Sequence, residues 1–346
     1  MTSPWERFAW RGAPLPQATL EETLRESLEL PRTLRPVQSP RAVQQAVFAP
    51  ALKQHARAYR AVDPDFGDTD LDSTWRVARR QALDLVLGAI AATPWADGLV
   101  LRGSVLLRAW FGDLAREPGD LDFVVSPVER RIDDPWTAAM LTGVARAAQD
   151  AAAAQGGALR FRAEDAVDEP IWTYDRVPGR RLVLPWILPD APELAGGGIQ
   201  LDFVFNEHLP VAPEPLRIPP LGGHGPGAVL RAVTPELSLA WKLMWLLTDC
   251  YPQGKDLYDA VLLAEHTPLR HAILKAVFVD ADPVEAARPL GVADIANLEL
   301  GGEWLHFRAE YPDLPEDERA LVARLAAATA PTFAAAEGLR EDPGPS

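Results

Sequence analysis

Two aspartates separated by a single leucine begin the short apolar segment DLDFVV. They are Asp120 and Asp122. Side chains two residues apart in a strand point to the same face, so a strand here would present both carboxylates together. Neighbouring carboxylates repel each other, and a divalent cation such as Mg²⁺ or Mn²⁺ resolves that repulsion while also accepting substrate phosphates. The pair therefore predicts metal ligands, although two solvated carboxylates at the end of a strand would show the same spacing.

A third acid, Asp202, is the only charged residue in the apolar segment IQLDFVF. A carboxylate inside a buried strand is unfavourable unless it is paired or bound to a metal. The segments LDFVV and LDFVF are nearly identical, as expected if two adjacent strands bring their acids to one edge of a sheet. Three carboxylates there could bind two metal ions for an in-line phosphoryl displacement. A salt bridge or an outward-facing side chain would also account for Asp202.

Gly103 and Ser104 lie between a predicted strand, LVL, and a predicted helix, VLLRAWF. A tight turn at the start of a helix offers backbone N–H groups that can bind a phosphate. Glycine lets a ligand approach the backbone closely, and the serine hydroxyl adds a donor. The turn therefore predicts a phosphate cradle shortly before the acidic pair.

Together these residues resemble the active-site pattern of the polymerase-β-like minimal nucleotidyltransferases, and the chain resembles most closely the AbiEii/AbiGii toxin family. The matching blocks come in family order over about Leu99 to Leu263: LVLRGSVLLRAWFGDLAREPGDLDFVV, IQLDFVF, ELSLAWKLMWLL and GKDLYDAVLL. Arg102 stands where the family usually has a lysine, and Ser104 stands where it has a second glycine. Arg116 matches the basic residue that precedes the acidic pair.

The resemblance implies an enzyme that uses Mg²⁺ or Mn²⁺ to transfer a nucleoside monophosphate from an NTP to an acceptor hydroxyl. The implied metal ligands are Asp120, Asp122 and Asp202. The implied nucleotide contacts are Arg102, Gly103, Ser104 and Lys242.

Two residues of the C-terminal half receive catalytic roles through the same resemblance. Lys242, on an otherwise apolar helix, would bind the triphosphate, although a lysine extending its ammonium from the margin of a core would look the same. Asp256 would hold Lys242 or help to activate the acceptor hydroxyl, but an acid in the first turn also stabilises a helix. Lys255 and Asp259 are interpreted as solvent-facing partners on that helix.

In the family that the chain resembles, the protein is the toxin of a type IV toxin–antitoxin or phage-defence system, and some members add nucleotides to the 3′ end of tRNA. The implied partners are an NTP, a tRNA or other RNA acceptor, and a separate antitoxin protein. Two alternatives stay open. One is nucleotidyl transfer to a small molecule, as in antibiotic-modifying relatives, and the other is a catalytically silent scaffold that binds a nucleotide.

Charge and composition narrow the range of partners. The chain has 346 residues, of which 34 are basic and 49 acidic, so its formal net charge is −15. This balance excludes a broad basic face for duplex DNA and favours a small acceptor over RNA. A local basic groove could still come from an arginine cluster: Arg76, Arg79, Arg80, Arg102, Arg108 and Arg116. We expect a cytoplasmic protein, because the chain has a single cysteine and its N-terminus does not resemble a signal peptide. We expect no membrane segment, because the chain lacks a long apolar run.

The helices and strands predicted around these residues indicate an α+β protein. We expect a polymerase-β-like mixed sheet flanked by helices, together with a helical C-terminal domain. The expected domains are an accessory segment over residues 1–74, a catalytic domain over 75–232 and a helical domain over 233–346. Apolar spacing predicts helices over 19–30 and 41–59 and another capped by Ser73 or Thr74. An alanine-rich segment predicts a helix over 135–155, and Thr234 is expected to cap a further helix. Strands are predicted at 99–101, 120–125, 180–188 and 199–205. The segment PPLGGHGPG, residues 219–227, predicts a boundary or an exposed loop, and only helices are predicted beyond it.

Overall fold

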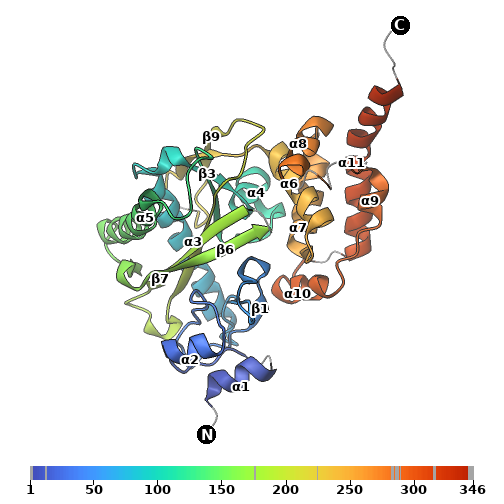
Figure 1. The fold of residues 1–346 in the computed structure, drawn as a ribbon. Coiled ribbons are helices and arrows are strands. Elements are labelled where there is room, and N and C mark those ends of the chain that lie inside the picture. Colours follow the sequence, from blue (N-terminus) through green and yellow to red (C-terminus); the bar gives the residue numbers. More distant parts are fainter. Residues whose placement is uncertain are drawn as a thin grey trace. The chain divides into compact units, whose positions relative to one another are not determined.

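The computed structural model describes residues 3–11, 14–174, 177–223, 225–281, 284, 288, 290–314 and 317–341. The chain divides into two compact units, both traced in Figure 1. Unit 1 comprises Met1–Leu101, Gly119–Asn206 and Pro215–Arg231, and unit 2 comprises Arg102–Pro118, Glu207–Glu214 and Ala232–Ser346.

Unit 1 is built around a mixed sheet. In the described residues this sheet has eight strands, in the order β5-β7-β8-β4-β3-β10-β9 with β6 paired to β7. Strands β4 and β8 run parallel, whereas β5, β6 and β8 are antiparallel to β7, and β6 and β7 form a long hairpin (Figure 1). The strands are β3 (Leu99–Arg102), β4 (Leu121–Val125), β5 (Arg160–Phe161), β6 (Val167–Tyr174), β7 (Val177–Ile187), β8 (Gly197–Val204), β9 (Glu214–Ile218) and β10 (Ala228–Ala232).

Two long helices, α3 (Thr69–Ala91) and α5 (Pro135–Ala154), pack against each other in unit 1, and α3 also packs on β8. Their buried residues recur at helical spacing, and the helix predicted over 135–155 is confirmed as α5. The predicted start of α3 was wrong. Asp68 is the cap, and its side chain accepts hydrogen bonds from the backbone N–H groups of Asp70 and Leu71. Asp68 belongs to the acidic segment DPDFGDTDLD, so the helix begins within that segment.

The N-terminal part of unit 1 contains α1 (Pro4–Arg11), α2 (Glu22–Ser27) and a two-stranded antiparallel sheet of β1 (Ala46–Phe48) and β2 (Tyr59–Ala61). The helix predicted over 41–59 was wrong, because Pro50 interrupts the segment and removes a backbone donor.

This N-terminal part is anchored to the main sheet through Glu169 of β6. The Glu169 carboxylate is 3% exposed and accepts a hydrogen bond of 2.9 Å from the backbone N–H of Thr33. It also lies 2.8 Å from Nε2 of His55. One buried carboxylate thus connects two loops of the N-terminal part to the sheet.

Unit 2 is helical over most of its described length. Helices α6 and α7 pack together, and α11 packs on α7, α8 and α9 (Figure 1). Thr234 caps α6 by accepting a hydrogen bond from the N–H of Leu237, and Pro235 is the first helical residue, as predicted. The helices are α4 (Ser104–Phe111), α6 (Pro235–Thr248), α7 (Gly254–His266), α8 (His271–Ala281), α9 (Val292–Ala296), α10 (Gly302–Glu310) and α11 (Glu318–Glu341).

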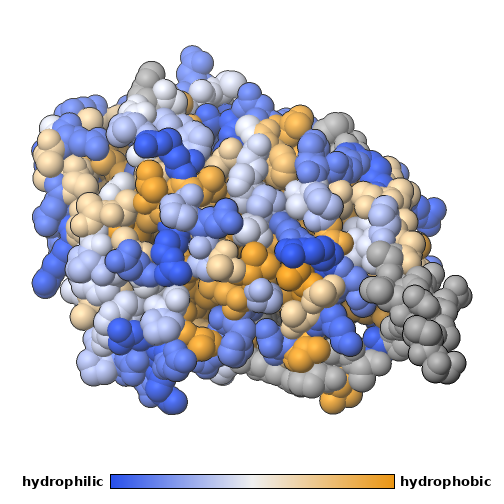
Figure 2. Space-filling model, turned by 90° about the horizontal axis from the view of Figure 1, so that it is seen from above, coloured by the Kyte–Doolittle hydropathy of each residue, from blue (hydrophilic) through white to orange (hydrophobic). Residues whose placement is uncertain are grey.

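The α+β prediction is confirmed by the mixed sheet and the helices around it. The prediction of helices alone beyond residue 227 was wrong, since β10 follows at Ala228–Ala232 with alternating burial along its length. Among the described helices, none combines the length and the apolar character needed to cross a membrane. On the face shown in Figure 2, groups of hydrophobic side chains are separated by hydrophilic ones.

Candidate active site

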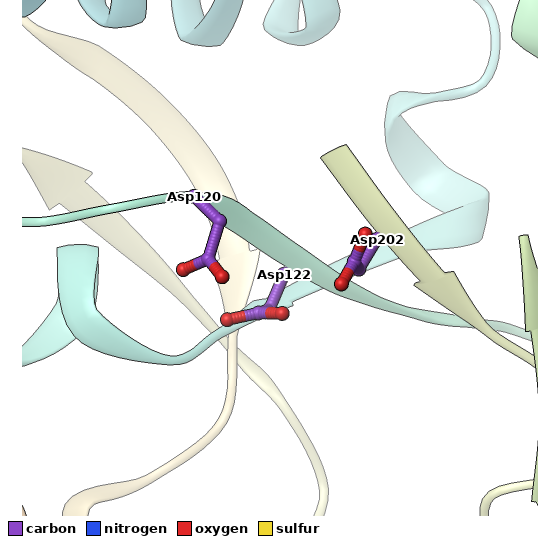
Figure 3. A group of neighbouring side chains, drawn as sticks. All are labelled: Asp120, Asp122 and Asp202. Atoms are coloured by element: carbon purple, nitrogen blue, oxygen red, sulfur yellow. The ribbon is translucent and has the colours of Figure 1, made fainter. Parts of the chain in front are cut away.

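Three carboxylates meet on neighbouring strands of unit 1 (Figure 3). Strands β4 and β8 are parallel and in register, with Asp122 opposite Asp202. Asp120 directly precedes β4, two residues before Asp122, so both point to the same face. One carboxylate oxygen from each of the three acids lies within 4.8 Å of the others. Hard oxygen ligands in this arrangement could hold a divalent cation.

Asp202 also has two polar neighbours in unit 1. Arg181 of β7 stands opposite it in the strand register and donates two hydrogen bonds, Nε to Oδ1 at 2.8 Å and Nη2 to Oδ2 at 2.7 Å. The amide nitrogen of Gln200 lies 3.2 Å from Oδ2 of Asp202 and 3.4 Å from Oδ2 of Asp120. The salt bridge considered for Asp202 is therefore present, within the same cluster as the three acids.

The predicted glycine–serine turn is present in unit 2, where it joins β3 to α4. Gly103 has φ of +85°, a conformation that a residue with a Cβ adopts only with strain. Ser104 is the first residue of α4, and its hydroxyl is buried without a hydrogen-bond partner among the described residues. A helix N-terminus with an unsatisfied hydroxyl offers donors and a favourable dipole to an anionic group.

Arg102, which precedes the turn, is 4% exposed. Its guanidinium lies 3.5 Å from the Glu207 carboxylate and stacks 5.2 Å from the ring of Trp241 and 5.3 Å from that of Trp245. The side chain is thus held by an acid and two aromatic rings within unit 2.

Lys242 of α6 is buried in unit 2 and points toward α7. Its ammonium lies 2.6 Å from Oδ1 of Asp256 and 3.0 Å from Oδ2 of Asp259. Burial lowers the pKa of a lysine, but here the two carboxylates outweigh burial and raise the pKa of Lys242. The lysine therefore keeps its positive charge, and the predicted pairing with Asp256 is present.

The prediction that Asp259 faces the solvent was wrong, because its side chain is buried and only 1% exposed. Arg116 donates two hydrogen bonds to it, at 3.0 and 2.9 Å, and a third of 3.0 Å to the hydroxyl of Tyr311. Burial raises the pKa of Asp259, but Arg116 and Lys242 together hold it below its ordinary value. The spacing of Asp256 and Asp259, three residues apart on one helix face, was the signal that could have identified this second acid.

Three of the six arginines that were expected to form a local basic groove are buried. Arg79, Arg102 and Arg116 are buried, at 7%, 4% and 6% exposure. Arg79 donates to the backbone carbonyl of Gly119 at 2.6 Å and lies 3.5 Å from Asp63. Because their charges are engaged inside the protein, these three side chains do not offer a basic surface to RNA.

Comparisons with known proteins identify the family of the chain. Residues 85–336 match the family described as nucleotidyl transferase AbiEii toxin of type IV toxin–antitoxin systems. Among solved structures, the chain is similar to MenT4, a nucleotidyltransferase toxin from Mycobacterium tuberculosis H37Rv. The identity is 18% and the TM-score 0.42, over 79% of this chain and 94% of that one. A search among proteins of curated function finds no match. The family match covers most of the chain and confirms the resemblance seen in its motifs, so the chain belongs to the AbiEii family of nucleotidyltransferase toxins.

Proposed function

We propose that the protein is a Mg²⁺-dependent nucleotidyltransferase that transfers a nucleoside monophosphate to the 3′ end of tRNA or another RNA. In this proposal it acts in the cytoplasm as the toxin of a type IV toxin–antitoxin or phage-defence system, and a separate protein is its antitoxin. Family membership supports the reaction class. The observation that carries the proposal is the approach of Asp120, Asp122 and Asp202 to within 4.8 Å.

The three acids suit a hard cation. Their donors are all oxygens, and Mg²⁺ prefers one or two carboxylates together with substrate phosphates. When bound, Mg²⁺ would supply positive charge that neutralises the triphosphate and stabilises charge developing during transfer. Mn²⁺ has the same ligand preference and can serve as its probe.

The nucleotide phosphates are assigned to the turn at Gly103 and Ser104 and to Lys242. The positive φ of Gly103 and the unsatisfied hydroxyl of Ser104 support a cradle for an anion at the start of α4. Lys242 supplies a positive charge that two neighbouring carboxylates maintain. Arg102 is assigned to the support of the turn, because its guanidinium is already held by Glu207.

One contact gives Asp256 two duties in this proposal. Its carboxylate accepts a hydrogen bond of 2.6 Å from Lys242, so it orients the ammonium. A carboxylate in this position can also accept the proton of an acceptor hydroxyl. Replacement of Asp256 by asparagine should separate the duties, because the amide oxygen still accepts a hydrogen bond from lysine but does not take up a proton.

A small-molecule acceptor is the second candidate. The formal net charge of −15 and the burial of three candidate arginines, Arg79, Arg102 and Arg116, favour an acceptor that needs little basic surface.

The test is incubation of the purified full chain with Mg²⁺ and each of the four NTPs labelled at the α-phosphate, either with total RNA or with an RNA-free extract of small metabolites as the source of acceptors. Label at RNA 3′ ends would support the first candidate, and label in a small product that needs no RNA would support the second. If neither RNA nor any small acceptor is labelled, and the protein still binds NTP, the silent scaffold is the better description.

A further inference from the structure

Arg181 occupies the middle of a row of charged residues that crosses four strands. In strand register, Glu169 of β6 stands opposite Arg181 of β7, Arg181 stands opposite Asp202 of β8, and Asp202 stands opposite Asp122 of β4. Residues opposite each other in adjacent strands point to the same face of the sheet. A single guanidinium therefore lies in a row of carboxylates, and two of those belong to the acidic cluster.

The contact between Arg181 and Asp202 is close and almost fully buried. Arg181 is 4% exposed and Asp202 is 7% exposed. Two nitrogens of the guanidinium bind the two oxygens of the carboxylate, a paired geometry that fixes the plane of the carboxylate. Burial lowers the pKa of an arginine, but Asp202 outweighs it and, with a smaller contribution from Asp120, raises the pKa of Arg181. The guanidinium thus keeps its charge beside the three acids.

The hydrogen bonds of Asp202 limit what else it can bind. A carboxylate has about four lone-pair positions. Arg181 takes two of them and the amide of Gln200 takes one, which leaves room for a cation shared with the other acids. Arg181 therefore offsets one of the three negative charges of Asp120, Asp122 and Asp202, which reduces the positive charge that bound cations must supply.

We propose that Arg181 is a positioning residue of the metal site. It holds Asp202 in a fixed orientation and takes the place of a second resident cation, so that the nucleotide-free protein binds one divalent ion. This inference rests on the proposed function only in treating the three acids as metal ligands.

Binding of Mn²⁺ to the full chain without nucleotide tests the proposal, with free and bound ion measured by electron paramagnetic resonance. The variants are Arg181→Gln, which removes the charge, and Arg181→Lys, which keeps the charge and loses the paired hydrogen bonds. Arg180→Gln is the matched control. Arg180 precedes Arg181 on β7, points to the opposite face and pairs with Asp168, so its loss changes net charge equally.

The wild-type protein should bind one Mn²⁺ tightly, and Arg181→Gln should bind it at least about tenfold more tightly, because a positive charge beside the ion is gone. Arg180→Gln and Arg181→Lys should stay within about threefold of wild type. In Arg181→Lys the spectrum of bound Mn²⁺ should broaden, because Asp202 is no longer held in one orientation. The proposal is overturned if wild type binds two ions tightly, if Arg181→Gln binds no more tightly than Arg180→Gln, or if the Lys variant has the wild-type spectrum.

Loss of Arg181 leaves the carboxylates in mutual repulsion, which can unfold the protein. Folding of Arg181→Gln is therefore followed by circular dichroism during the Mn²⁺ titration. Unfolding without metal and refolding when Mn²⁺ is added would support the proposal, since metal and guanidinium would then be interchangeable. A variant that stays unfolded at every Mn²⁺ concentration would overturn it, because Arg181 would serve the fold alone. None of these measurements needs nucleotidyl transfer, so a wild-type protein that transfers no nucleotide would overturn only the proposed function.

Discussion

Replacement of Asp259 by asparagine is predicted to lower the free energy of unfolding by about 3–5 kcal/mol, the usual effect of removing one partner from a buried ion pair. Asp259 accepts two hydrogen bonds from Arg116 and lies 3.0 Å from the Lys242 ammonium. Asparagine keeps the size of the side chain and removes its charge. Two buried cations then lose the carboxylate that they share, and their mutual repulsion adds to the loss.

Urea unfolding followed by tryptophan fluorescence measures this change, since the ring of Trp245 lies 5.3 Å from the Lys242 ammonium and reports on the same region. The exposed residue Asp313 provides the control, and Asp313→Asn should change stability by less than about 0.5 kcal/mol. Adding Arg116→Met to Asp259→Asn should restore part of the loss, because the excess positive charge is removed. A loss below about 1 kcal/mol for Asp259→Asn would refute the view that this cluster is a tightly coupled ion network.

Lowering the pH should weaken the stabilisation that the Asp259 carboxylate provides. Because its pKa is lowered in the folded state, Asp259 stabilises the protein fully above its unfolded pKa of about 3.9, and this stabilisation disappears as the pH falls through the folded value. Urea titrations at decreasing pH should therefore show a smaller loss for Asp259→Asn than for wild type. Asp122→Asn should abolish the rise in Tm caused by Mg²⁺, because the site loses one of its three carboxylates. Asp202→Asn should instead lower the metal-free Tm, because buried Arg181 loses its charged partner. Glu169→Gln should speed limited proteolysis within residues 1–60 on the order of tenfold, measured by timed trypsin digestion, because the anchor for the N-terminal loops is weakened.

Local sequence signals were sufficient for the elements that carry the predicted site. The strand at Asp122, the strand at Asp202 and the capped start of α6 at Thr234 were all predicted correctly. Each depends on alternation or capping within a few residues, which the chain itself displays. The near-duplicate segments around the two acids also predicted correctly that the two strands lie side by side.

The partners of those residues could not be predicted in the same way. Arg181 lies in an apolar segment that was predicted as a strand, but its contact with Asp202 depends on the register between β7 and β8. Register between strands is set by turns and by burial across the whole sheet, and a local pattern does not determine it. The pairing of Arg116 with Asp259 likewise joins residues far apart in the chain.

Residues 41–59 show how a local signal can mislead. Apolar spacing there is compatible with a helix, yet residues 46–48 form β1, and Pro50 begins a single helical turn. The hydrogen bonds of β1 come from β2, so tertiary pairing overrides the local preference.

The central claim is that the acidic cluster supports transfer of a nucleoside monophosphate, and the fate of two labels tests it most directly. The full chain is incubated with Mg²⁺, acceptor RNA and an NTP that carries one label at the α-phosphate and another at the γ-phosphate, beside the Asp122→Asn variant. We predict that the α label appears in the RNA and the γ label in pyrophosphate, and that Asp122→Asn produces neither. Transfer of the γ label to the acceptor, or equal labelling by wild type and Asp122→Asn, would contradict the account.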